Sequence, residues 1–282
     1  EMVMPVLEAI EAMGIRKIVF QGFSRNADLL LLAIKARFLE EVECFAVTHV
    51  TTTQFEHFFE IEQIRALQMR LSRGVLKGLG SVKADFGAAF EEFYPHTLIN
   101  YAPNIDPGLH LEKDSPVSIH VPLDVSWRKN MYTNVTAGML CESVERIKTS
   151  NYPTGLSDIR VLDKLMLTGY LRGQRLLDEM SRSTAVISAT LAECQPMTQL
   201  EAFAMNTPAL TLDLGLVEFE GDPLMELCST RVTDNPYRLS KDIGRLVDAA
   251  LSDPAAMSGM IRDHLDTRTR LATERLKDFV GI

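Results

Sequence analysis

Several features that would assign this sequence to a function class are missing from it. No run of 18 apolar residues occurs, so no segment is expected to cross a membrane as a helix. Acidic residues outnumber lysine and arginine by 38 to 29, and the net charge of −9 argues against a nucleic-acid-binding protein. The amino-terminal segment is acidic and amphipathic, whereas a signal peptide has a basic start and a continuous apolar core.

Metal-binding patterns are also missing. The four cysteines form no CxxC or CxxH unit, the six histidines lack metal-ligand spacing, and no DxD pair follows an expected strand. Cysteines dispersed in this way are expected to stay reduced, which favours a cytoplasmic setting. The composition is 46% hydrophobic and 24% charged over 282 residues, which is typical of a globular protein with one large or two medium domains.

Apolar runs alternate with helical patterns along the first part of the chain. This alternation is typical of βαβ units with mainly parallel sheets. We predict strands over 17–22, 42–50, 78–83 and 97–101, and helices over 26–40, 61–76 and 86–93. Residues 102–116 hold three prolines and no clear period, so we expect a linker there.

The alternation restarts after the linker. We predict strands over 117–121, 146–150, 164–168, 184–189 and 209–214, and helices over 128–142, 174–182 and 198–205. Asp222-Pro223 is expected to open a further helix as N-cap and first residue, and the tail from 237 is almost entirely helical. These patterns predict two α/β domains, 1–108 and 115–253, followed by C-terminal helices over 254–282.

Residues 184–213 combine an apolar strand, a helix and two glutamates. Seven residues separate Glu193 from Glu201, and the strand-to-helix junction lies between them. Open α/β sheets bind ligands where strands end and helices begin, and a helix N-terminus there offers free N–H groups to phosphate. The segment predicts a nucleotide-diphosphate site with two carboxylates at its rim, or else an ordinary βαβ unit with two surface glutamates.

The same segment resembles a known family. Glu-x7-Glu, followed by Ala-Phe-Ala-Met and Thr-Pro-Ala, is similar to the donor-binding motif of retaining glycosyltransferases of the GT-B fold, family 4-like. The resemblance implies an α/β fold of two Rossmann-like domains, the first compact or N-terminally shortened, with C-terminal helices that cross back to it. A cleft between the two domains would then hold the site. The resemblance is clear over 115–213 and weak before residue 103.

The resemblance assigns roles around the diphosphate. Lys129 matches the lysine of the family's pyrophosphate site, at the start of a helix, where a cation stabilises the departing phosphate. The family arginine lies several residues earlier, where this chain has Asp124, and Arg128 is a candidate substitute. Three backbone N–H groups at the next helix start are expected to face the distal phosphate, those of Met197, Thr198 and Gln199.

Further roles concern the ribose, the base and the sugar. Glu201 resembles the glutamate that holds the ribose hydroxyls, since a carboxylate can accept two hydrogen bonds from a vicinal diol. Glu193 resembles the glutamate near the reacting centre, and His49 resembles a histidine that contacts the donor sugar. The loop expected to pass the nucleobase consists of Gly169, Tyr170 and Leu171. A plain turn at Gly169 and a structural role for His49 are the alternatives.

Together these features predict a retaining, metal-independent hexosyl- or pentosyltransferase. Its donor would be a UDP- or GDP-sugar, with no other cofactor. A sugar-nucleotide epimerase on the same fold and a non-catalytic nucleotide-binding interaction module are the alternatives. The sequence does not identify the acceptor, which could be a glycan, a lipid, a protein or a small molecule; modified DNA is disfavoured by the acidic charge.

Overall fold

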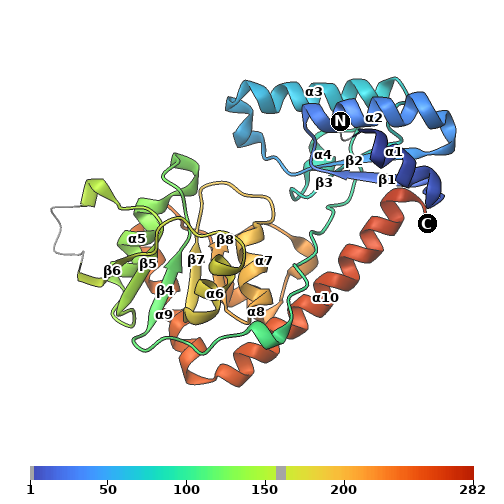
Figure 1. The fold of residues 1–282 in the computed structure, drawn as a ribbon. Helices are drawn as coiled ribbons and strands as arrows, with labels where there is room; N and C mark the ends of the chain where they lie inside the picture. Colours follow the sequence, from blue (N-terminus) through green and yellow to red (C-terminus); the bar gives the residue numbers. More distant parts are fainter. Residues whose placement is uncertain (1–2, 157–162) are drawn as a thin grey trace. The chain divides into compact units, whose positions relative to one another are not determined.

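A computed structural model describes residues 3–156 and 163–282 (Figure 1). The chain divides into two compact units, one of residues 1–100 with 271–282 and the other of residues 101–270. Each unit contains a parallel β-sheet with helices against it, so the α/β fold expected from the alternating pattern is confirmed. Within the described residues, no helix is both long enough and apolar enough to cross a bilayer.

The first unit is built on a parallel sheet in the order β1-β2-β3, as far as the described residues show. Its strands are β1 (Lys17–Gln21), β2 (Glu43–Thr48) and β3 (Gly78–Ser81). Its helices are α1 (Val3–Ala12), α2 (Arg25–Phe38), α3 (Phe58–Ser72) and α4 (Phe86–Ala89). Apolar side chains of the helices and strands form one buried core, which includes Leu7, Leu31, Ile34, Ala46, Leu67 and Leu79.

The final turns of α10 (Pro254–Val280) also belong to the first unit. Phe279 packs edge-on against Phe45 of β2, with ring centroids 5.4 Å apart. Gly78 of β3 lies under the same ring, because a Cβ added there would come within 3.2 Å of the Phe279 ring. The glycine therefore leaves the space that this phenyl ring fills.

Two sequence expectations for the first unit are wrong. Residues 97–101 form no strand, although Leu98 and Ile99 are buried. An apolar run indicates that a segment is buried, but this buried segment does not pair with a neighbouring strand through the repeated hydrogen bonds of a β-sheet. The helix expected over 86–93 is only the short α4, after which Phe90 and Phe93 pack against Phe86.

The second unit has a parallel sheet in the order β6-β5-β4-β7-β8-β9 within the described residues. Its strands are β4 (Ser118–Val121), β5 (Arg146–Thr149), β6 (Leu165–Leu167), β7 (Ala185–Ser188), β8 (Ala209–Leu212) and β9 (Ser229–Thr230). Counted from β4, this is the strand order 3-2-1-4-5-6 of the Rossmann fold. The winding direction reverses between β4 and β7, which makes their carboxyl ends the switch point of the sheet.

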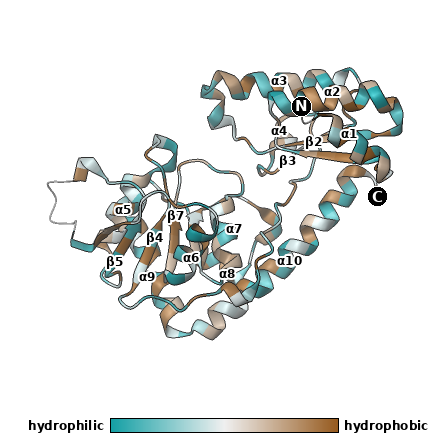
Figure 2. Cartoon of the chain, viewed as in Figure 1, coloured by the Kyte–Doolittle hydropathy of each residue, from teal (hydrophilic) through white to brown (hydrophobic). Residues whose placement is uncertain are grey.

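Helices cover both faces of this sheet. They are α5 (Met131–Leu140), α6 (Gln174–Arg182), α7 (Met197–Ala204), α8 (Pro223–Cys228), α9 (Pro236–Ser252) and the first part of α10. Gly138 of α5 lies against Ile119 and Ile147, and α5 packs on α9. On the other face, Lys148 of β5 forms an ion pair with Glu179 of α6. In Figure 2 the strands are mostly brown, that is, apolar, whereas the helices mix brown and teal residues.

The strands and helices expected for the second unit largely match. All five predicted strands are present as β4 to β8 within two residues at each end, and α6 has the predicted bounds. The helix expected over 128–142 is wrong in its first turn, because a 3₁₀ turn at Trp127–Lys129 precedes α5. Asn130 separates the two with φ of 57°, a left-handed conformation that asparagine tolerates better than most residues.

Candidate functional site

The candidate site lies in the second unit, where β4 and β7 end. Residues 122–130 follow β4, and residues 189–196 follow β7. These strands are neighbours in the sheet, but the chain continues from them in opposite directions. Open α/β sheets bind ligands at such a switch point, outside the carboxyl ends of the strands. The fold therefore brings two loops that are about 60 residues apart in sequence to the position expected for a ligand site.

Hydrogen bonds to backbone carbonyls hold the two loops together. The amide of Leu191 donates to the carbonyl of Arg128 at 2.9 Å, and the Arg128 Nη1 donates to the carbonyl of Ala192 at 2.9 Å. Asn130 Nδ2 donates to the carbonyl of Ala189 at 3.1 Å. The left-handed backbone at Asn130 thus turns the chain into α5 while its side chain contacts the end of β7.

Asn134 fixes the same junction from inside the domain. Its side chain is fully buried in α5, and its Oδ1 accepts a hydrogen bond from the Ala189 amide at 2.9 Å. Its Nδ2 donates to the carbonyls of Ala189 at 2.9 Å and Asn130 at 2.8 Å. Asn134 is not among the site residues predicted from the sequence, although an asparagine in the apolar segment 131–140 is itself a signal, because buried amides need partners.

Three charged side chains meet at this junction. Arg128 Nη1 donates to Oε1 of Glu193 at 3.1 Å, and Lys129 Nζ forms an ion pair with the same oxygen. The side chains of Arg128, Lys129 and Glu193 are 23%, 26% and 14% exposed. Two cations therefore converge on one carboxylate oxygen in a partly desolvated setting, where charge interactions are stronger than at an open surface.

Asp124 adds a second carboxylate near these cations. Its Oδ1 accepts a hydrogen bond from the Ser126 amide at 2.8 Å. Burial raises the pKa of Asp124, but the hydrogen bonds from Ser126 and the charges of Lys129 and Arg128 outweigh it and lower the pKa below 3.8. Asp124 is therefore ionised at neutral pH, at the position where the family resemblance expects an arginine.

The start of α7 offers two free amides beside this cluster in sequence. Pro196 precedes the helix and supplies no side-chain cap. Within the described part of the chain, the amides of Met197 and Thr198 have no acceptor, and helix N-termini of this kind suit anions. The backbone amide of Gln199, which was expected to face the distal phosphate, already donates to the carbonyl of Pro196 at 3.1 Å. The Gln199 side chain also donates to the carbonyl of Ala209 at 3.1 Å, which ties α7 to β8.

Glu201 presents an acceptor without a donor. Its side chain is half-buried in α7, and it makes no hydrogen bond or ion pair with any residue in the ranges 3–156 and 163–282. Burial raises the pKa of Glu201 above its ordinary value of 4.5. A carboxylate in this state gains from two donated hydrogen bonds, as a vicinal diol would supply.

The remaining candidates lie farther along the sheet or in the first unit. Gly169 follows β6 with φ of 67°, a turn conformation that favours glycine. Tyr170 is 75% exposed, and the Arg172 guanidinium lies 4.7 Å from its ring centroid. His49 belongs to the first unit, where its Nε2 lies 3.2 Å from Gln21 Oε1 and desolvation lowers its pKa.

The contact expected between the nucleobase and Gly169, Tyr170 and Leu171 stays a prediction, and so does the contact expected between His49 and the donor sugar. Within the described residues, no cluster of three or more histidine, cysteine, aspartate or glutamate side chains could hold a metal ion.

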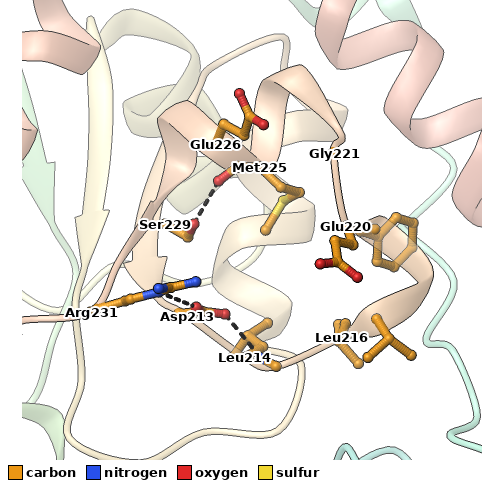
Figure 3. A pocket seen from close by; sticks show the side chains of 12 residues that line it. Asp213, Leu214, Leu216, Glu220, Gly221, Met225, Glu226, Ser229 and Arg231 are labelled. Atoms are coloured by element: carbon orange, nitrogen blue, oxygen red, sulfur yellow. Dashed lines mark hydrogen bonds and ion pairs between the residues drawn. The ribbon is translucent and has the colours of Figure 1, made fainter.

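A pocket that our sequence analysis missed lies at the next strands of the second unit. Its volume is about 360 Å³, and the loop after β8, helix α8 and the end of β9 line it (Figure 3). Asp213 accepts hydrogen bonds there from the Gly215 amide and from Arg231 Nε, both at 3.0 Å. Glu220 and Glu226 add two further carboxylates. No predicted site residue lines this pocket.

Solved structures with this architecture are known. HepE from Anabaena, in complex with UDP, aligns over 99% of this chain and 82% of its own length, with a TM-score of 0.64 and 12% identity. TarM from S. aureus, a mutant solved with fondaparinux, alpha-GlcNAc-glycerol and UDP, aligns over 98% of this chain with a TM-score of 0.68 and 12% identity. This chain spans 58% of TarM.

A glycosyltransferase from Rickettsia africae aligns over 98% of this chain and 79% of its own length, with a TM-score of 0.58 and 14% identity. These neighbours are GT-B glycosyltransferases. The chain has the GT-B fold. No protein-family model and no curated protein sequence matches the chain, so the likeness rests on the fold.

Proposed function

We propose that the chain is a retaining glycosyltransferase that takes its sugar from a UDP- or GDP-sugar. The observation that carries this proposal is the convergence of Arg128, Lys129 and Glu193 at the switch point of a Rossmann-type sheet. Neighbouring folds have been solved with UDP, which supports a nucleoside-diphosphate donor. The acceptor could be a glycan, a lipid, a protein or a small molecule.

The donor-binding roles are those that the family resemblance implies, and the charges and hydrogen-bonding capacity of the second unit support them. The diphosphate would contact Lys129 and Arg128 and the free amides of Met197 and Thr198. The unpartnered Glu201 carboxylate would accept hydrogen bonds from both ribose hydroxyls. The β6–α6 loop, with Gly169, Tyr170 and Leu171, would pass the base. In this arrangement the second unit would hold the nucleotide, and the sugar would lie beyond the diphosphate, towards Glu193.

Sugar transfer requires that the bond between the anomeric carbon and the diphosphate breaks. Negative charge then develops on the leaving phosphate, and pre-positioned cations and amides stabilise such charge in the transition state. Lys129 is the strongest candidate for this work, because its ammonium is partly desolvated and already pairs with an anion. Retention is consistent with the leaving phosphate taking the proton of the acceptor hydroxyl, so that no side-chain base is needed.

Donor binding is tested by calorimetry with UDP and GDP. The Glu201→Ala variant should bind about 10- to 150-fold more weakly, since hydrogen bonds to a charged group contribute about 1.5–3 kcal/mol. The matched control is Glu142→Ala, which removes an exposed carboxylate at the amino side of β5. Unchanged affinity in a folded Glu201→Ala protein would remove Glu201 from the donor site.

Catalysis is tested by release of nucleoside diphosphate from a panel of UDP- and GDP-sugars, with and without candidate acceptors. The Lys129→Ala variant should lose turnover while its unfolding midpoint changes little. A wild-type rate in this variant would refute the role of Lys129. Conversion of the donor sugar without nucleotide release would point instead to an epimerase.

A further inference from the structure

Glu193 forms ion pairs with the two cations that the proposed function assigns to the donor diphosphate. Its Oε1 is shared between Arg128 Nη1 and Lys129 Nζ. A phosphate oxygen that bridged both cations would need the position that this carboxylate oxygen holds. Because all three side chains are at most 26% exposed, solvent screens these ion pairs only in part.

The local charge balance makes this contact consequential. Arg128 and Lys129 supply two positive charges, and Glu193 with the ionised Asp124 supplies two negative ones. With both carboxylates in place, the cluster has no net charge to attract an anion. Moving the Glu193 carboxylate away leaves an excess of one positive charge around Arg128 and Lys129.

We propose that Glu193 is an internal counter-anion, which closes the diphosphate site until the donor displaces it. This inference rests on the proposed function, because it concerns the same two cations. The backbone near Glu193 is anchored, since Cys194 and Gln195 are both 4% exposed and Ala192 accepts a hydrogen bond from Arg128. Displacement therefore needs only a new rotamer of the Glu193 side chain.

The contact imposes a cost on every anion that binds. A ligand must break two ion pairs before it forms its own, so the measured affinity is lower than the intrinsic affinity of the open site. Glu193→Gln keeps the shape of the side chain and removes the competing charge. Glu193→Ala removes both the shape and the charge, so it tests the same idea if the glutamine still bridges the cations.

The experiment measures binding of UDP, GDP and inorganic pyrophosphate by calorimetry at constant ionic strength. Glu193→Gln and Glu193→Ala should bind these ligands more tightly than wild type, by up to about fivefold for each of the two ion pairs removed, because an ion pair of this kind contributes up to about 1 kcal/mol. Glu142→Gln, the matched control, should leave the affinities unchanged. Pyrophosphate isolates the cation site, since it lacks the ribose that Glu201 would contact.

In a Lys129→Ala background, Glu193→Gln should raise the affinities less than it does in the wild-type background, because one of the two cations that Glu193 pairs with is already gone. If wild type binds UDP or GDP but folded Glu193→Gln and Glu193→Ala bind no more tightly, the counter-anion role is refuted and the donor site stands. If neither wild type nor the variants bind any of the three ligands, the proposed function itself is overturned, and the inference with it.

Discussion

The Asn134→Leu substitution tests how the fold supports the site. Leucine has the same branched arrangement of side-chain heavy atoms as asparagine but cannot hydrogen-bond. The change therefore removes three hydrogen bonds, and the bulkier methyl groups add crowding at this buried position. Two of the three partners retain another bond. The Ala189 carbonyl still accepts from Asn130 Nδ2 at 3.1 Å, and the Asn130 carbonyl still accepts from the backbone amide of residue 134 at 3.2 Å.

Only the Ala189 amide is left without a partner. A buried donor without an acceptor costs about 1–3 kcal/mol, so the free energy of unfolding should fall by about that amount. The loss is local, because Ala189 is where β7 passes into the loop that carries Glu193. We therefore expect weaker binding of UDP or GDP as well, since the loop would be held less firmly, by its remaining hydrogen bonds to residues 128–130.

Urea denaturation followed by circular dichroism measures the stability, and calorimetry measures the nucleotide affinity. The matched control is Thr136→Val, also in α5, whose hydroxyl only donates to the carbonyl of Tyr132 within the helix at 2.8 Å. The control should cost less than about 0.5 kcal/mol. A loss below that value for Asn134→Leu would refute the reasoning that this amide holds the end of β7.

Two further predictions concern stability. Lowering the pH from 7 to 5 should reduce the free energy of unfolding by about 2 kcal/mol through His120 alone. Burial and the charge of Lys148 lower the pKa of His120 from 6.5 to about 3, so this side chain gains a proton only on unfolding in this pH range. His120→Phe should remove that part of the pH dependence, and urea titrations in which the variant's free energy of unfolding still changes with pH as in wild type would contradict the prediction. Gly87→Ala should destabilise the first unit, since the added Cβ would lie 2.2 Å from the Tyr94 carbonyl oxygen. Gly259→Ala should stabilise α10 by up to about 1 kcal/mol, because the nearest atom to its added Cβ is 4.0 Å away. Equal thermal midpoints for the two variants would refute this difference.

Local patterns in the sequence determined most of the second unit. Strands β4 to β8 and helix α6 follow from apolar periodicity, because side chains that face a core repeat every two residues in a strand and every three or four in a helix. The N-cap at Asp222 also followed from the sequence, and its Oδ1 accepts from the Leu224 and Met225 amides. Such signals depend on neighbours within a few residues, so they need no knowledge of the fold.

Apolar patterns gave a wrong prediction where a segment is buried but does not pair as a strand. Residues 97–101 are apolar enough to resemble a strand, but whether a buried segment joins a ladder depends on an edge that another part of the chain supplies. The two-residue strand β9 is too short to show any period. At Asn130, a single left-handed residue ends the 3₁₀ turn and starts α5, and its polar side chain bonds to Ala189 and Thr233, distant in sequence.

The candidate site was only half determined by the sequence. The Glu-x7-Glu pattern and the Arg128-Lys129 pair marked two separate loops, but their meeting depends on the order of the strands in the sheet. Only the tertiary structure shows that Arg128 and Lys129 pair with Glu193, more than 60 residues along the chain, and that Glu201 has no partner among residues 3–156 and 163–282. Strand order is set by which crossovers bury the most apolar surface on both faces of the sheet, and that is a property of the whole chain.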